Sequence, residues 1–199
     1  YFPSLADATI FDGKVETLIG VTNRTRVVPK WTKVVTIDEV SEIPKLPKQT
    51  VVINAAAFRY DASRLELAQS DILIHNTDII NKVFHFCAER NIKELRLSSS
   101  IAVYPMNLPL MDDSKPVDLN AAPNPHEIFY AWSKRYAETL AELYREKFGI
   151  NTLTFRLSNP YGPYDSIQEE RAHVAPAFVM KALNDKPIFT ILGGPSVER

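Results

Sequence analysis

Tyr130 and Lys134 stand four residues apart within the stretch IFYAWSKRYAETLAELYREKFG, residues 128–149. On a helix this spacing places both side chains on one face. A lysine ammonium close to a phenol stabilises the phenolate and lowers its pKa from about 10. Such a phenol can give a proton to a carbonyl oxygen, or take one from an alcohol, near neutral pH. The same pair also occurs by chance on many helices, so its meaning depends on the surrounding sequence.

Three serines, 98–100, end the apolar segment IKELRLSSS at residues 92–100. A hydroxyl at the end of a strand can hydrogen-bond the same substrate oxygen as the phenol and fix its position. Together these groups suit hydride transfer to or from a carbonyl, in which a cofactor supplies the hydride. Serines at strand ends also serve turns and helix caps, and this alternative stays open.

Short apolar, β-branched runs alternate along the chain with longer segments of helical period. Strands are predicted within 17–26, 32–38, 50–57, 92–100 and 150–163, and helices at 70–91, 128–149 and 174–185. This alternation predicts βαβ units and therefore an α/β fold: a Rossmann-like, doubly wound parallel sheet with helices on both faces. The proline-rich stretch 105–127 is too long for a plain connector, which predicts a functional segment.

The ends of three predicted strands carry the candidate functional residues. In a parallel sheet, ligands bind outside the carboxyl ends of the strands. That rule places NAAA (54–57), SSS (98–100) and SNPYGP (158–163) on one rim. The helix that carries Tyr130 begins near the same rim.

The composition excludes several functional classes. The chain has 199 residues, 45% of them hydrophobic and 24% charged, with a net charge of −1. These values are typical of a globular protein and predict neither nucleic-acid binding nor membrane binding. No window is as apolar as a membrane span, and no metal site is predicted. The single cysteine, Cys87, cannot form an internal disulfide, so we expect an inert packed thiol and a reducing, cytoplasmic location.

The order of these motifs resembles the extended short-chain dehydrogenase/reductase family, which contains nucleotide-sugar epimerases, dehydratases and reductases. VVINAAAF resembles the strand that ends beside the cofactor, and HNTDIINKVFHFCAE resembles the helix after it. LSSSIAVYP resembles the active-site strand, YAWSK the Tyr-Lys pair, and RLSNPYGP the loop that closes on nicotinamide and sugar. The resemblance runs from about residue 17 to the last residue.

The resemblance implies a role for each matching residue. The catalytic residues would be Ser100, Tyr130 and Lys134. The cofactor, NAD or NADP, would contact Arg24, Asn54, Ala55, Ala56, Ala57, Asn76, Ser98, Tyr130, Lys134, Asn159 and Tyr161. The substrate, a nucleotide sugar, would contact Ser100, Asn159, His173 and Arg199. A homodimer through the helices at 71–90 and 130–148 is also implied.

The chain departs from the family pattern at both ends. The first βα unit and its glycine-rich phosphate loop are missing, because the only glycines before residue 149 are Gly13 and Gly20. We expect an incomplete nucleotide-binding domain at 1–163 and the start of a substrate-binding region at 164–199. Residues 1–16 are assigned to no element, and the chain is interpreted as a fragment that we expect to bind dinucleotide poorly by itself.

Two positions discriminate among members of the family. Dehydratases resemble one another in carrying Asp-Glu after the catalytic serine, whereas Ile101 and Ala102 cannot transfer protons. The loop YGPYDSIQEERAHVAPAF resembles that of GDP-fucose synthases and places His173 at the position of their histidine. The cysteine that works with that histidine is replaced by Ala102, so keto reduction fits better than double epimerisation. His173 equally fits a residue that packs or caps at a helix start.

The choice of cofactor and the exact activity stay open. Arg24 and Arg26 can accommodate a 2′-phosphate, which favours NADP and reduction. A 4-epimerase, a reductase of a non-sugar ketone, and a catalytically silent Rossmann-type binding module are further interpretations of the same residues.

Overall fold

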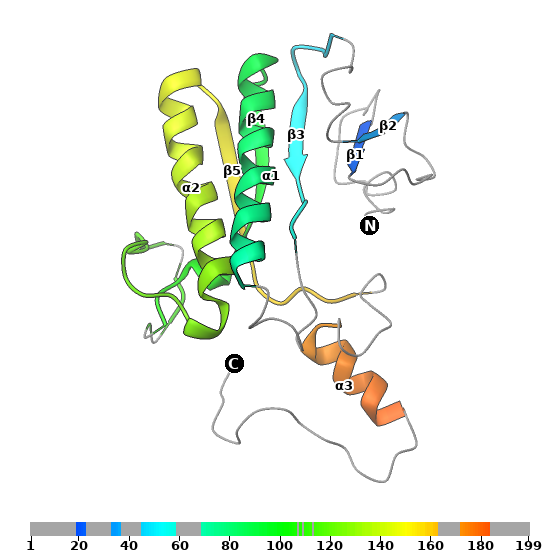
Figure 1. Cartoon of the computed structure of the whole chain (residues 1–199), viewed down its shortest axis with the longest axis vertical. Helices are drawn as coiled ribbons and strands as arrows, with labels where there is room; N and C mark the ends of the chain where they lie inside the picture. Colours follow the sequence, from blue (N-terminus) through cyan, green and yellow to red (C-terminus); the bar gives the residue numbers. More distant parts are fainter. Residues whose placement is uncertain are drawn as a thin grey trace.

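The computed structural model describes residues 19–22, 33–36, 45–58, 69–106, 108, 110–112, 114–162 and 172–183. Its strands are β1 (Ile19–Thr22), β2 (Lys33–Thr36), β3 (Val51–Asn54), β4 (Glu94–Ser100) and β5 (Asn151–Leu157). Its α-helices are α1 (Gln69–Glu89), α2 (Ile128–Phe148) and α3 (Val174–Leu183), and two short 3₁₀ helices, η4 (Ile101–Val103) and η5 (Pro125–Glu127), lie between β4 and α2 (Figure 1).

The sheet that carries the candidate site is parallel and has the order β3-β4-β5. Asn54 pairs with Leu97, and Ser100 pairs with Leu157, so the carboxyl ends of the strands share one edge. β1 and β2 form a separate parallel pair. Helix α1 connects β3 to β4, and α2 connects β4 to β5 (Figure 1). The predicted α/β fold with a parallel sheet is confirmed.

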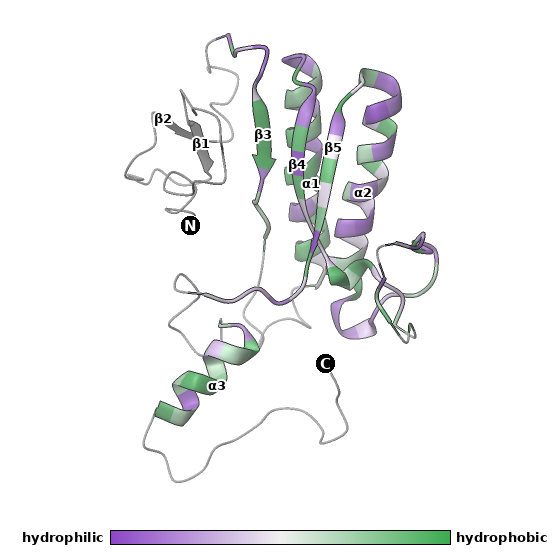
Figure 2. Cartoon of the chain, turned by 180° about the vertical axis from the view of Figure 1, so that it is seen from behind, coloured by the Kyte–Doolittle hydropathy of each residue, from purple (hydrophilic) through white to green (hydrophobic). Residues whose placement is uncertain are grey.

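Both connecting helices lie on the same face of this sheet (Figures 1 and 2). The two crossovers advance in the same direction across the sheet, and right-handed connections then place both helices on one side. On the opposite face, apolar side chains of β3 and β5 are 44–50% exposed: Val51, Ile53, Leu153, Phe155 and Leu157. Within the described residues, helices therefore cover one face and leave the other open.

The core lies between the sheet and the two helices. Alternate β4 residues, Leu95 and Leu97, are fully buried and pack with Phe84 and Cys87 of α1. Each large apolar side chain that is fully buried contributes about 1.5–3 kcal/mol. Burial raises the pKa of the Cys87 thiol to about 12. Cys87 is thus the packed thiol that its apolar surroundings predict.

Helix α2 ends at Gly149, which has φ +64° and lies in the left-handed region. Its N–H donates to the carbonyl of Arg145 at 3.0 Å, and the N–H of Ile150 donates to Tyr144 at 3.4 Å. These bonds satisfy the last helical carbonyls and turn the chain directly into β5. Ile150 is fully buried, which fixes this corner in the core.

Among the described residues, no helix is both long enough and apolar enough to span a membrane.

Candidate active site

Tyr130 and Lys134 face each other on the first turns of α2. The Lys134 Nζ lies 5.5 Å from the centroid of the Tyr130 ring, as the spacing of the two residues predicts. Lys134 is only 4% exposed, and its ammonium donates a hydrogen bond of 2.8 Å to the backbone carbonyl of Ser98. Burial lowers the pKa of Lys134 from 10.5 to about 8. The site therefore holds a poorly hydrated cation beside a phenol.

Ser100 ends β4 and caps the 3₁₀ helix η4. Its Oγ accepts a hydrogen bond of 3.2 Å from the N–H of Ala102. The capping role left open by the sequence is therefore real. As the acceptor in this bond, the Ser100 hydroxyl keeps its own hydrogen for donation to a further oxygen.

The chain directly after β3 exposes its backbone, because small residues follow Asn54. Asn54 is 4% exposed, and its Oδ1 accepts a hydrogen bond of 3.1 Å from the N–H of Ala56. Its buried Nδ2 has no hydrogen-bond partner within the described structure. Ala55, Ala56 and Ala57 follow as three exposed residues without a side chain beyond Cβ. The small side chains leave room for a flat ring to approach the backbone closely at this edge.

Asn76, in α1, joins the segment after β3 to the helix. Its Oδ1 accepts a hydrogen bond of 2.7 Å from the N–H of Phe58, and its Nδ2 donates to the Phe58 carbonyl at 3.3 Å. The Phe58 ring lies 4.4 Å from that of His75, centroid to centroid. The amide of Asn76 thus holds the strip of alanines in place. Its predicted contact with the cofactor stays a prediction.

The remaining predicted residues lie at the end of β5 and beyond it. Asn159 has φ +22°, and both Asn159 and Tyr161 are exposed. His173 is partly buried, and its carbonyl accepts a hydrogen bond of 2.9 Å from the N–H of Ala177, which places it at the start of α3. That position agrees with the helix-start alternative without deciding its role. Arg24 and Arg199 lie outside the described residues, as does Arg26.

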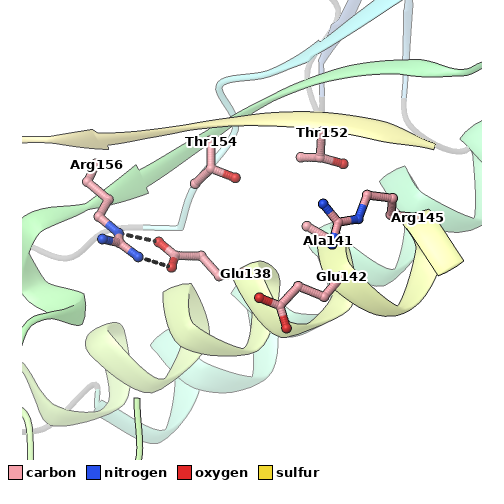
Figure 3. Close-up of a pocket in the computed structure, with 7 residues that line it drawn as sticks. All are labelled: Glu138, Ala141, Glu142, Arg145, Thr152, Thr154 and Arg156. Atoms are coloured by element: carbon pink, nitrogen blue, oxygen red, sulfur yellow. Dashed lines mark hydrogen bonds and ion pairs between the residues drawn. The ribbon is translucent and has the colours of Figure 1, made fainter. Parts of the chain in front are cut away.

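A partly buried ionic network, which the sequence patterns did not predict, lies one turn beyond Lys134. The Glu138 carboxylate accepts hydrogen bonds from Nε and Nη2 of Arg156 at 3.1 and 2.8 Å (Figure 3). The Ser99 hydroxyl donates to the same carboxylate at 2.6 Å. The Arg156 guanidinium also lies 5.2 Å from the Tyr104 ring centroid. The spacing of Glu138 four residues after Lys134 was the one signal in the sequence, since it puts both on one helical face.

A cavity of about 420 Å³ opens beside this network, between α2 and β5 (Figure 3). It is lined by Glu138, Ala141, Glu142, Arg145, Thr152, Thr154 and Arg156. None of the residues predicted to be catalytic lines it. The candidate active site is therefore the rim formed by the ends of β3, β4 and β5 with the start of α2.

Comparison with known proteins agrees with this geometry. The family model described as the NAD dependent epimerase/dehydratase family matches residues 5–199. The chain belongs to this family.

Curated relatives within the epimerase/dehydratase family are enzymes of nucleotide-sugar metabolism. A dTDP-4-dehydro-6-deoxy-D-allose reductase of Streptomyces is 29% identical over 136 residues, which cover 68% of this chain and 41% of that enzyme. GDP-L-fucose synthase 1 of Arabidopsis thaliana is 28% identical over 112 residues, 56% of this chain and 34% of that enzyme. The chain thus spans less than half the length of these relatives.

Solved structures share the fold. UDP-glucose 4-epimerase from Brucella ovis, in complex with NAD, superposes with a TM-score of 0.67 at 21% identity, covering 91% of this chain and 57% of that protein. This likeness confirms the Rossmann-like architecture expected from the strand and helix order.

Proposed function

We propose that the complete protein is an NAD(P)-dependent nucleotide-sugar enzyme that transfers hydride to or from C4 of the sugar, with Tyr130 as proton donor and acceptor. One observation carries this proposal: the buried Lys134 ammonium lies beside the Tyr130 ring and is held by the Ser98 carbonyl. A lysine that is buried next to a phenol fits a role in proton transfer better than a role on the solvated face of a helix.

The residues of this chain would divide the proton chemistry among them. Tyr130 gives its proton to the C4 carbonyl oxygen during reduction, or takes it from the alcohol during oxidation. Lys134 stabilises the phenolate that remains. Ser100 donates its hydroxyl hydrogen to the same oxygen and orients it. The bound nicotinamide would supply or accept the hydride.

The dinucleotide would lie along the carboxyl edge of the sheet. Its nicotinamide end is proposed to lie on the exposed alanine strip after Asn54. Ser98, Asn159 and Tyr161 are its further proposed contacts. Residues 1–163 would belong to the nucleotide-binding domain, and 164–199, with His173 and Arg199, to the substrate-binding region.

Keto reduction is favoured over dehydration and epimerisation. Ile101 and Ala102 follow Ser100, so neither position can supply an acid or a base for loss of water. The curated relatives include a 4-keto-sugar reductase and a GDP-L-fucose synthase. His173→Ala tests whether His173 contacts the substrate or acts as an acid. A rise in KM alone indicates a substrate contact, whereas a fall in kcat indicates an acid.

A homodimer through α1 and α2 is part of the proposal. The two helices pack side by side, and Ile74, Trp132, Tyr136 and Leu143 remain 36–61% exposed on them. Sedimentation of the complete protein tests this: a monomer at micromolar concentration contradicts it.

The experiment that tests the function starts from the complete protein, purified, denatured and assayed for released nucleotide. An empty protein that oxidises NADPH with a 4-keto nucleotide sugar is a reductase, and tightly retained NAD indicates a 4-epimerase. An empty protein that reduces only non-sugar ketones contradicts the sugar substrate. Inertness towards all of these leaves a silent binding module.

A further inference from the structure

Arg135, the residue directly after Lys134, is a buried cation whose hydrogen bonds within the described part of the chain all go to backbone carbonyls. It is 2% exposed. Its Nε donates to the carbonyl of Val103 at 2.9 Å, and its Nη1 donates to the carbonyls of Leu119 at 2.8 Å and Ala121 at 2.6 Å. One side chain of α2 thus holds three carbonyls that lie as many as 18 residues apart in the chain.

These three carbonyls belong to the two arms of residues 103–123, called the 103–123 segment, which runs from the last residue of η4 towards η5. Val103 lies on the arm that leaves β4, and Leu119 and Ala121 lie on the arm that returns towards α2. The arms meet at an antiparallel bridge between Pro105 and Pro123.

The arms are weakly joined to each other at that bridge. Proline has no N–H, so neither bridge residue can donate a backbone hydrogen bond. Among the described residues, the backbone hydrogen bond between the arms is the one from the Met106 N–H to the Ala122 carbonyl, at 3.2 Å. Among the described residues, the guanidinium of Arg135 supplies three hydrogen bonds at the base of the segment, and the arms share this one between themselves.

The burial of this charge is unfavourable in itself. Within the described structure no carboxylate forms an ion pair with Arg135, and its Nη2 has no partner. Desolvation lowers the pKa of Arg135, and the more distant charges of Asp118 and Glu138 offset this only in part. The Trp132 ring, 5.0 Å from the guanidinium, covers it. An apolar side chain would pack here at lower cost but could not hold the three carbonyls.

We propose that Arg135 is a positioning residue for the active site: by tying both arms of the 103–123 segment to the first turns of α2, it fixes Ser100 relative to Tyr130. Val103 lies three residues after Ser100, and Arg135 lies five residues after Tyr130. The guanidinium therefore links the two catalytic elements by a short path. This inference rests on the proposed function for its catalytic part.

The test compares Arg135→Met and Arg135→Lys in the complete protein with the wild type. Arg145→Met is the matched control, because Arg145 is an exposed arginine of the same helix. Mass spectrometry measures the rate of backbone hydrogen exchange in the 103–123 segment. The exchange rate in α1 serves as the control for correct folding. Steady-state kinetics with a nicotinamide cofactor and a 4-keto nucleotide sugar give kcat and KM separately.

In Arg135→Met we expect exchange in the 103–123 segment at least tenfold faster, with α1 unchanged, and a kcat at least tenfold lower with the KM for cofactor within twofold. Arg135→Lys keeps the charge but cannot reach both arms, so its exchange rate and kcat should lie between those of the wild type and those of Arg135→Met. If Arg135→Met does not fold, Arg135→Lys takes its place in the test. Arg145→Met should match the wild type in both measurements.

Unchanged exchange in the segment overturns the anchoring, whatever the activity. Faster exchange with an unchanged kcat overturns the positioning role and leaves Arg135 a structural residue. An inactive wild type contradicts the proposed function and the catalytic part of this inference together, while the exchange data still decide the anchoring. The two failures are thus distinguishable.

Discussion

The ammonium of Lys134 donates its hydrogen bond to the backbone carbonyl of Ser98, so the helix that carries Tyr130 is joined to the strand that carries Ser100. The proposed catalytic hydroxyls are close by: Ser100 lies two residues after Ser98 on the strand, and Tyr130 lies four residues before Lys134 on the helix. In the proposed mechanism, this one buried cation therefore both fixes the geometry of the site and stabilises the phenolate of Tyr130.

Tyr130→Phe should lower kcat of the complete protein by about 10²–10⁴-fold, because it removes the hydroxyl that is the proposed proton donor. The Tyr130 side chain is partly exposed, so the fold should be retained. Circular dichroism checks the fold, and steady-state assays check kcat. Activity within a few-fold of the wild type would show that another group donates the proton.

Lys134→Met should raise the pH at which activity appears. The phenol loses the neighbouring positive charge, so its ionisation requires a higher pH. The measurement is the pH profile of kcat for the variant and the wild type. A profile that does not move would mean that Lys134 only binds cofactor or packs.

Lys134 should also make stability depend on pH in a defined direction. Its pKa is about 8 in the folded protein and 10.5 as the ordinary value, so the unfolded chain binds more protons between these limits. Below pH 8 the folded protein carries the full unfavourable free energy of burying a charged ammonium. This unfavourable contribution decreases as the pH rises towards 10.5. Across this pH range, the free energy of unfolding of the wild type should therefore rise by up to about 3 kcal/mol relative to that of Lys134→Met. Denaturant unfolding of both proteins at pH 7.5 and 10.5 measures it, and a constant difference between them would contradict it.

Glu138→Gln should destabilise the protein by about 1–3 kcal/mol, because Arg156 loses a partly buried carboxylate that accepts two of its hydrogen bonds. The side chains of Arg156 and Glu138 are 20% and 11% exposed. Glu142→Gln, one turn further along α2 and exposed, is the control. Equal unfolding free energies for the two variants would show that the network adds nothing to stability.

Gly149→Ala should cost about 1 kcal/mol, because φ +64° is unfavourable for a residue with a Cβ. Space is no obstacle, since no atom lies within 4 Å of the point that an added methyl carbon would occupy at Gly149 or at Gly162. Gly162 lacks the positive φ, so Gly162→Ala is a control for the added methyl group alone. Thermal unfolding compares the two, and similar melting temperatures would contradict the argument.

The alternation of strands and helices was predictable because it rests on local patterns. The apolar period of 70–91 and 128–149 matches α1 and α2 to within two residues at each end. β3 stops at Asn54, short of the predicted 57, because the three alanines that follow are exposed and lack ladder partners.

The polar network and the anchor on α2 were not predictable in the same way. Glu138 and Arg135 look like residues of a solvated helix face when the sequence is read alone. Their partners, Arg156 and the carbonyls of the 103–123 segment, come close only once β5 and the long connection have folded against α2. Such contacts depend on long-range register, which local periodicity does not encode.

The fully buried Cys87 has a practical consequence for measuring how this protein moves. It is the only cysteine among these 199 residues, so a thiol-reactive dye can label this chain at one position. With its side chain enclosed between α1 and the sheet, the thiol reacts only when that interface opens. The labelling rate, divided by that of an unstructured cysteine peptide, then reports the equilibrium constant for opening of the core. The sequence thus carries its own probe of local unfolding, without any engineered label.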